Sequence, residues 1–386
     1  MANIVNTVNK IMQDFASITG LELDNPIPKR YLWTDSFAVC NYLELFNENK
    51  DKKYLNLALR LVDQVHHTLG KHRKDDVRKG WISGLNEKKG ELHPTQGGLR
   101  IGKSMNERKP HEPFNERMEW DQDGQYYHYL TKWMHALNKA SITTKNESYI
   151  KWALELAKTT HRSFIYNPGL GQKKRMCWKM SIDLSYPLVP SMGQHDPLDG
   201  FVTYNELQMN IKKNFNSVSN LDLQNEISDM ANICRGMNLI TSDPLGIGGL
   251  LFDASRVIQI IIKGNKDYND LLKHILNSAL QGVDFYASSN NIKLPIEYRL
   301  AFRELGLSIG LKGIKYIEKW FDEYSYIDSQ LEQIIAYFEP YLDIGNTIDE
   351  FWMNPENQRA KSWIDHKEIN MVMLATSLAP KEFITI

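Results

Sequence analysis

Apolar residues recur three or four positions apart along most of the chain, and the alternation typical of strands is almost absent. Residues 2–18 carry one apolar stripe, which runs from Ile4 through Ile11 to Phe15. Residues 33–46, in contrast, are apolar on most faces, which is typical of a helix that is buried all round. The pattern therefore predicts an all-α protein.

The same reading along the whole chain predicts twelve helical segments, which would pair into six helical hairpins. In chain order the segments are residues 2–18, 33–46, 52–69, 123–139, 145–165, 199–213, 221–236, 248–262, 267–287, 297–311, 314–338 and 364–379. No linker interrupts the helical pattern. We therefore predict one domain over residues 1–386, because closed repeats can exceed the usual size of a single core.

Short and long connections alternate between these segments. The links that leave even-numbered segments are short and polar, such as 47–51 and 140–144, whereas links that enter them are often long, as at 70–122, 166–198 and 339–363. Loops beyond about 12–15 residues are usually functional or disordered, and the tryptophans and prolines in these loops favour packed structure. In a closed ring of hairpins, the long loops would share one face, where we expect the function to lie.

Acidic and aromatic residues gather where the even-numbered segments begin. The motifs are LWTDSF with Trp33 and Asp35, EWDQDG with Trp120, Asp121 and Asp123, GQHDPLDGF with His195, Asp196 and Asp199, and SWIDHKE with Trp363, Asp365 and His366. This organisation resembles the (α/α)6 toroid of the six-hairpin glycosidase superfamily over essentially the full chain. The resemblance implies inner helices whose N-termini open on the loop face, and an activity on carbohydrates.

Two aspartates are the preferred catalytic pair. The GQHDPLDGF motif resembles unsaturated glucuronyl and rhamnogalacturonyl hydrolases, in which an aspartate before glycine at the mouth of an inner helix is the acid/base, and this implies that role for Asp199. Asp123 also precedes a glycine at a helix start. A glycoside hydrolase needs one carboxyl to protonate the leaving oxygen and a second to position water. Asp121 and Asp35 are further candidates, although aspartate is also a common helix cap.

Aromatic and polar side chains on the loop face are candidates to bind the substrate. The tryptophans outside helix interiors are Trp33, Trp81, Trp120, Trp178, Trp352 and Trp363. Such rings stack on sugars, although long loops also need an apolar core of their own. The polar candidates are Glu119, His195, Asp196, Arg100 and Arg117.

Composition excludes several other classes of protein. The chain has 386 residues, with 46 Lys and Arg against 47 Asp and Glu, so no basic field favours nucleic acid or an anionic membrane surface. The three cysteines are far apart, so we expect no metal site and no cofactor. The N-terminus lacks the pattern of a signal peptide, and no apolar run is long enough for a membrane span, so we expect a cytoplasmic protein.

Two other functions remain open at this stage. The same toroid hosts sugar epimerases of the N-acylglucosamine 2-epimerase type, which would give weight to His195, His366 and His128. A non-catalytic helical scaffold is the third possibility, because fold does not determine function. The basic residues of the loop 70–122 are interpreted either as a lid for acidic sugars or as a solvated surface. The sequence leaves the oligomeric state open.

Overall fold

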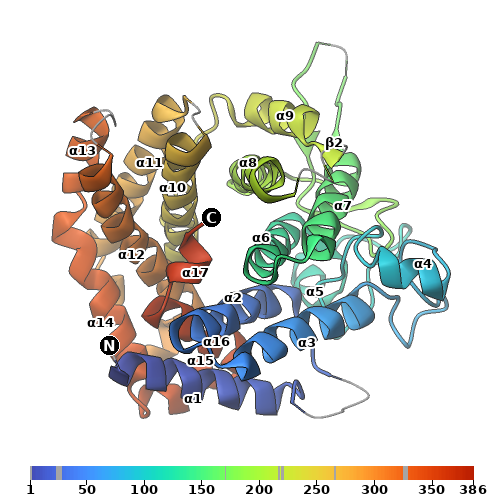
Figure 1. Cartoon of the computed structure of the whole chain (residues 1–386), viewed down its shortest axis with the longest axis horizontal. Coiled ribbons are helices and arrows are strands. Elements are labelled where there is room, and N and C mark those ends of the chain that lie inside the picture. The colour runs from blue at the N-terminus through green and yellow to red at the C-terminus, as the bar shows by residue number, and fades with distance from the viewer. Residues whose placement is uncertain are drawn as a thin grey trace. The chain divides into compact units, whose positions relative to one another are not determined.

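Helices account for most of the computed structural model, which describes residues 2–22, 28–169, 171–215, 218, 221–264, 267–324 and 329–386. The chain divides into two compact units (Figure 1). Unit 1 comprises Met1–Phe15 and Asn238–Ile386, and unit 2 comprises Ala16–Met237. The single domain over residues 1–386 stays a prediction.

Unit 2 is built from hairpins in which a buried helix packs on an amphipathic one. The hairpins are α2 (Leu32–Asn49) with α3 (Lys52–Leu69), α6 (Tyr127–Thr144) with α7 (Glu147–Phe164), and α8 (Asp196–Asn214) with α9 (Gln224–Cys234). The buried helix α6 also packs against α2 and α8. The first member of each hairpin is therefore an inner helix, as the apolar pattern of residues 33–46 predicts.

Two of these hairpins turn through the same local structure. The residues Lys50 and Lys145, with φ of 58° and 59°, end α2 and α6 in the left-handed conformation. The next residues, Asp51 and Asn146, are the N-caps of α3 and α7. Their side chains accept hydrogen bonds from the backbone N–H groups of Lys53 and Ser148. This explains why the connections that leave the inner helices are short.

The long connections of unit 2 meet in a small antiparallel sheet. Strand β1 (Gln125–Tyr126) precedes α6, and it pairs with β4 (Lys179–Met180), which in turn pairs with β5 (Pro187–Val189). A second pair, β2 (Ile165–Tyr166) and β3 (Arg175–Met176), continues α7. Within unit 2 the two long loops therefore lie together, as the alternation of connection lengths predicts.

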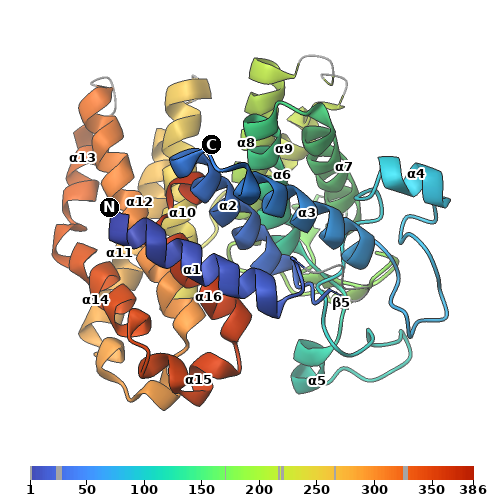
Figure 2. The same cartoon turned by 60° about the horizontal axis from the view of Figure 1, so that its bottom comes forward.

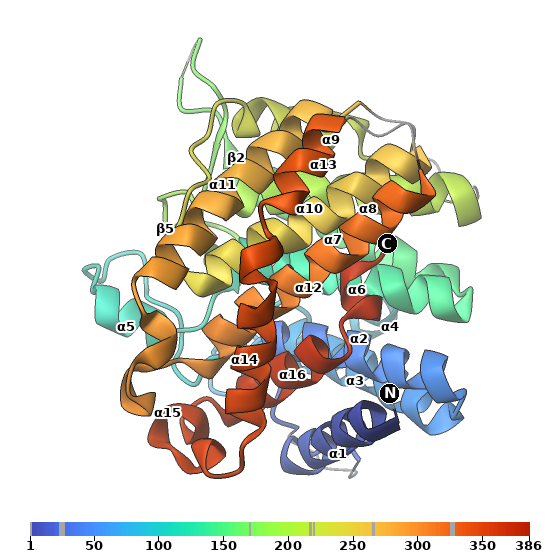
Figure 3. The same ribbon diagram turned by 90° about the vertical axis from the view of Figure 1, so that its left-hand side faces the viewer.

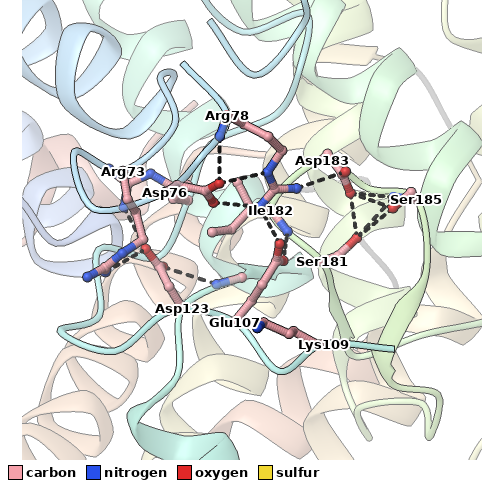
Figure 4. A network of polar contacts seen from close by, with 12 residues as sticks. Arg73, Asp76, Arg78, Glu107, Lys109, Asp123, Ser181, Ile182, Asp183 and Ser185 are labelled. Carbon is pink, nitrogen blue, oxygen red and sulfur yellow. Dashed lines mark hydrogen bonds and ion pairs between the residues drawn. The ribbon is translucent and has the colours of Figure 1, made fainter. Parts of the chain in front are cut away.

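The loop 70–122, which contains the short helices α4 (Glu87–Leu92) and α5 (Glu116–Asp121), is held by ion pairs. The Arg78 guanidinium contacts Asp76 at 2.7 Å, Glu107 at 2.5 Å and Asp183 at 2.9 Å (Figure 4). Glu107 also accepts a hydrogen bond from the backbone N–H of Ile182. Because this arginine pairs with two carboxylates of the loop 70–122 and with one of the loop before α8, it joins the two loops.

Unit 1 contains the remaining helices, except that residues 16–18 of α1 belong to unit 2. They are α1 (Ala2–Ile18), α10 (Pro244–Gly264), α11 (Asn269–Ser288), α12 (Ala301–Glu323), α13 (Ser329–Ala336), α14 (Leu342–Met353), α15 (Lys361–Ile364), α16 (Lys367–Leu378) and α17 (Lys381–Ile384). Helix α10 packs against α11 and α12, and α12 packs against α14 and α16 (Figure 3).

The segments predicted near the end of the chain are wrong in their bounds. The predicted helix 297–311 and the first part of the predicted helix 314–338 form one helix, α12, and the predicted loop 339–363 contains α14. The predicted break falls at residues 312–313, but α12 continues through it, and Gly313 lies where α10 approaches closely, since an added Cβ would come within 2.5 Å of the Ser255 hydroxyl. The segment 342–353 buries Gly345, Ile348 and Trp352 at helical spacing, and this stripe was missed.

One helix of the described part of the chain, α10, is long and apolar enough to span a membrane by length and composition alone. In the structure, 78% of the apolar window is buried inside the protein. This burial is typical of a core helix.

Replacing Gly248 of α10 by alanine is expected to destabilise unit 1 by about 1–3 kcal/mol. A Cβ atom there would overlap the carbonyl oxygen of Gly306, so the helices α10 and α12 would have to separate. The neighbouring Gly249 has nothing within 4 Å of its added Cβ. Gly249→Ala should therefore stabilise the helix by about 0.5–1 kcal/mol. Urea unfolding of both variants measures the two changes, and equal effects would contradict the close approach.

Candidate active site

The first turn of α8 carries two buried carboxylates, Asp196 and Asp199. The sequence HDPLDG begins the helix here, with Pro197 in the first turn, where its missing N–H costs no hydrogen bond. Residues three apart lie on the same side of a helix, so both carboxyl groups point into the same region of unit 2. Their side chains are only 9% and 7% exposed.

Asp199 is held by two residues of the neighbouring helix α6. Its Oδ2 accepts a hydrogen bond from Nζ of Lys132 at 2.8 Å and another from the hydroxyl of Thr131. Lys132 is itself buried, so this is an ion pair in the interior. A buried ion pair of this kind is costly to break from one side only.

The environment of Asp196 is different. Its Oδ2 has no hydrogen-bond partner among the described residues, and its Oδ1 lies 3.7 Å from Nδ1 of His128. Gly193 lies against this carboxyl, and a Cβ atom there would come within 2.5 Å of Oδ2. Burial, and secondly the charge of Asp199, raise the pKa of Asp196 to about 8, although Lys132 opposes the shift. Asp196 therefore carries a proton at neutral pH.

His128 is the titratable group beside this acid. Burial and the charge of Lys132 lower the pKa of the His128 imidazole to about 3, while Asp199 acts in the opposite direction. The imidazole is therefore neutral at pH 7. Its Nδ1 has no hydrogen-bond partner in the part of the chain that the structure describes, although 26% of the side chain is exposed. A neutral carboxylic acid and a neutral imidazole thus face each other.

Aromatic rings surround His128 and form what we call the aromatic cluster. The ring of Trp178 lies parallel to the imidazole at 6.1 Å and 9°, and Tyr126 stacks on it at 5.5 Å and 24°. Trp33 and Tyr129 meet it edge to face, at 5.9 and 4.8 Å. Stacked aromatic rings beside a proton donor suit the apolar face of a sugar.

Several predicted site residues do meet here. Trp33, Trp178, Asp196 and Asp199 lie in or beside the aromatic cluster, and Trp120 contacts Trp178 edge to face at 5.2 Å. The predicted residue His195 precedes α8 as its N-cap and is partly exposed.

Asp123 lies in a different environment from Asp196. Its side chain is fully buried, with Oδ2 at 2.5 Å from Nη1 of Arg100 and at 3.5 Å from Nη1 of Arg73. Its Oδ1 accepts hydrogen bonds from the backbone N–H groups of Gly102 at 3.0 Å and Gly124 at 3.1 Å. These contacts make Asp123, together with the predicted binding residue Arg100, an anchor for the loop 70–122.

Asp35 likewise has its partners close by, in the residues just before its own helix, α2. It pairs with Arg30 at 3.2 Å and accepts a hydrogen bond from the backbone N–H of Tyr31 at 2.9 Å, as a capping side chain does. Burial raises the pKa of Asp35 to about 6, although Arg30 opposes the shift.

The remaining predicted residues lie in three places. Asp121 and Arg117 are exposed on α5, where Glu119 is buried and pairs with Lys179 and Arg108. Trp81 is buried, and its indole N–H donates to Glu87. In unit 1, Trp352 and Trp363 are buried and stack on each other at 5.7 Å, and Trp352 donates to Glu304. These three tryptophans pack the interior of the protein.

The sequence interpretation missed the contribution of the first turns of α6. Tyr126, Tyr129, Thr131 and Lys132 all belong to the run QYYHYLTK, and none was a candidate. The signal was the density of aromatic residues directly after an Asp-Gly helix start. His128 was considered only for the epimerase alternative, yet it lies at the centre of the aromatic cluster.

Within the described residues, no group of three or more His, Cys, Asp or Glu side chains is arranged to hold a metal ion. A proton donor, a buried ion pair and aromatic rings are the chemistry that this site contains.

Comparison with solved structures shows the fold. The α-mannanase of family GH76 from Bacteroides thetaiotaomicron is 11% identical, with 97% of this chain and 96% of that chain covered and a TM-score of 0.54. An inactive variant of the α-1,6-mannanase from Salegentibacter sp. HEL1_6 matches at 9% identity, 98% and 99% coverage and a TM-score of 0.50. A sugar epimerase from a ruminal bacterium matches at 9% identity, 90% and 87% coverage and a TM-score of 0.50.

The chain shares the (α/α)6 fold of these solved structures. This confirms the predicted all-α class and the predicted toroid. No protein-family model matches the sequence, and no curated protein matches it either. At these identities the solved structures show the fold alone.

Proposed function

We propose that the protein is a carbohydrate-active enzyme, and more specifically a glycoside hydrolase in which Asp196 is the general acid. The observation that carries the proposal is the Asp196 carboxyl, which is buried, has an oxygen without a hydrogen-bond partner among the described residues, and has a pKa raised to about 8. A glycosidase needs such an acid to protonate the leaving oxygen, beside a second carboxylate. Asp199, one helical turn away, is that second carboxylate.

The proposal changes the predicted catalytic pair from Asp123 and Asp199 to Asp196 and Asp199. The Salegentibacter mannanase supports it, because its inactive variant has two consecutive aspartates replaced by asparagine and is bound to α-1,6-mannotriose. The present pair is three residues apart instead of consecutive. Two aspartates close together in sequence are nevertheless common to the two proteins.

Turnover of two oligosaccharide series tests the proposal. We choose α-1,6-mannooligosaccharides and β-1,4-glucooligosaccharides, and new reducing ends are the measurement. We expect release from at least one series by the wild type and none by Asp196→Asn. Asp121→Asn, an exposed aspartate on α5, is the matched control and should leave the rate unchanged. Full activity of Asp196→Asn would refute the assignment.

A sugar epimerase is the second candidate function, and the pair of His128 and Asp196 favours it. A neutral imidazole can remove the proton beside a sugar carbonyl, and a protonated carboxyl 3.7 Å away can donate one. His366, also considered for this role, is exposed on unit 1. If the protein is an epimerase, sugar recovered from D₂O should contain deuterium, and His128→Gln should prevent its incorporation.

The pH dependence of kcat/KM should show the titration of Asp196. Its pKa is raised to about 8, so the acid form that donates the proton is present below that pH and is lost above it. We expect kcat/KM to fall about tenfold per pH unit on the alkaline side of pH 8. If kcat/KM falls at the same alkaline pH for a series of substrates, the group that titrates belongs to the free enzyme. A fall that begins near pH 5 would contradict the raised pKa of Asp196.

We further propose that the enzyme acts in the cytoplasm on an oligosaccharide or sugar, without nucleic acid, membrane or metal. The balanced charge of the chain supports the exclusion of nucleic acid. Fractionation of cells and a metal analysis of the purified protein would test these points.

A further inference from the structure

Trp120 on α5 presents a large aromatic surface to solvent. It is 49% exposed, and α5 lies with β5 at the loop end of unit 2 (Figure 2). An exposed ring that is continuous with further aromatic rings, unlike a single exposed side chain, indicates a binding surface.

The position of this ring is fixed, although α5 has only six residues. Nζ of the buried Lys179 donates hydrogen bonds to the backbone carbonyl oxygens of Glu119 at 2.7 Å and Gln122 at 2.9 Å, and it pairs with the Glu119 carboxylate at 2.9 Å. Arg108 holds the other carboxylate oxygen at 3.0 Å. Trp120 lies between two residues that are anchored in this way, so it is a pre-organised platform.

The platform is continuous with the aromatic cluster. Trp120 meets Trp178 at 5.2 Å, and Trp178 is parallel to His128 at 6.1 Å. Lys179, which anchors α5, also lies over the Tyr126 ring at 5.2 Å. The rings thus form a path from the acid Asp196 outward to solvent, and this path is longer than a single sugar ring is wide.

A polar group of the kind that reads sugar hydroxyls lies on the same side of the short helix. Arg117 is exposed and precedes Trp120 by three residues, a spacing that places side chains on one face. A flat ring with a guanidinium on the same face suits a saccharide better than it suits a purely apolar partner.

We propose that Trp120 forms an outer saccharide subsite, and that the substrate is therefore a chain that extends from Asp196 past Trp178 to Trp120. This inference rests on the proposed function, because it places the cleaved or altered unit at Asp196. A single sugar or a disaccharide would fill the site at the aromatic cluster and leave Trp120 uncovered.

Binding by length tests the subsite. The Asp196→Asn protein, which should bind without turnover, is titrated calorimetrically with both oligosaccharide series, from the monosaccharide to the hexasaccharide. We expect the affinity to rise with length, and Trp120→Ala to weaken the longest ligands about threefold to tenfold while the shortest are unchanged. Met118→Ala is the control, since Met118 lies on the same helix and is 45% exposed, and it should change neither.

The subsite and the proposed function can fail separately. Affinity that does not depend on length, or Trp120→Ala that weakens short and long ligands equally, would overturn the subsite even if the wild type hydrolyses a substrate. Absence of binding in both series would also overturn it. A wild-type dimer that Trp120→Ala dissociates would assign Trp120 to an interface between copies of the chain and would likewise overturn it. Length-dependent binding lost in Trp120→Ala would support the subsite even without turnover.

Discussion

Asp196→Asn is expected to abolish turnover and at the same time to raise the Tm. Loss of a general acid lowers kcat by about 10²–10⁴. The stability effect arises because the folded protein raises the pKa of this carboxyl from 3.8 to about 8, chiefly by burial. A group with a raised folded pKa contributes most favourably below its unfolded pKa, and stability is lost as the pH rises toward 8. Asparagine carries no charge at any pH and avoids this loss.

The gain in stability of Asp196→Asn depends on pH. The free-energy cost of keeping Asp196 protonated in the folded protein rises between pH 3.8 and pH 7 to about 4 kcal/mol, because one pKa unit corresponds to 1.36 kcal/mol. We expect the Tm of Asp196→Asn to exceed that of the wild type by about 5 °C at pH 7 and to match it near pH 4. Thermal unfolding followed by circular dichroism at several pH values measures this. A Tm lowered equally at every pH would show that Asp196 has a structural role instead.

Asp123→Asn is expected to have the opposite effect on stability. The change leaves the guanidinium of Arg100 without its carboxylate partner at 2.5 Å and weakens the contact with Arg73. Removing one member of a buried ion pair usually costs about 3–5 kcal/mol, and the Tm should fall by roughly 5 °C. Asparagine keeps one oxygen, so the hydrogen bonds from Gly102 and Gly124 can persist. Activity per folded molecule, assayed well below the Tm, should persist as well.

Asp121→Asn is the matched control for this change, because Asp121 is two residues away and exposed. It should alter neither the Tm nor the turnover. If Asp123→Asn abolished turnover while the Tm stayed constant, Asp123 would return as the catalytic residue that its position before Gly124 suggests.

These two aspartates show why the candidate site could be predicted only in part. Asp123 and Asp199 both precede a glycine near the start of an inner helix, so the local pattern treats them alike. Their partners come from elsewhere. Arg100 lies in a loop before Asp123, and Lys132 lies on another helix from Asp199. The ionisation and role of a carboxyl depend on such neighbours, which no local motif reveals.

The helices themselves follow a different rule. The apolar stripe of α3 and the all-round burial of α2 are local properties of the sequence, since side chains three and four apart share a face. The failure at α12 has a tertiary cause, because Gly313 reads as a break in isolation and lies in contact with Ser255 of α10. Without that neighbour, the sequence offers no reason to continue the helix through it.

The sequence by itself determined the all-α class, most of the helices and the concentration of acids and tryptophans at the starts of inner helices. Only the tertiary structure decided which of them act together. It buried Trp352 and Trp363 against each other, paired Asp123 with Arg100, and left Asp196 protonated beside His128. The physical reason is that helix formation depends on periodicity within about one turn, whereas protonation and ring stacking depend on burial and on charges that are distant in sequence.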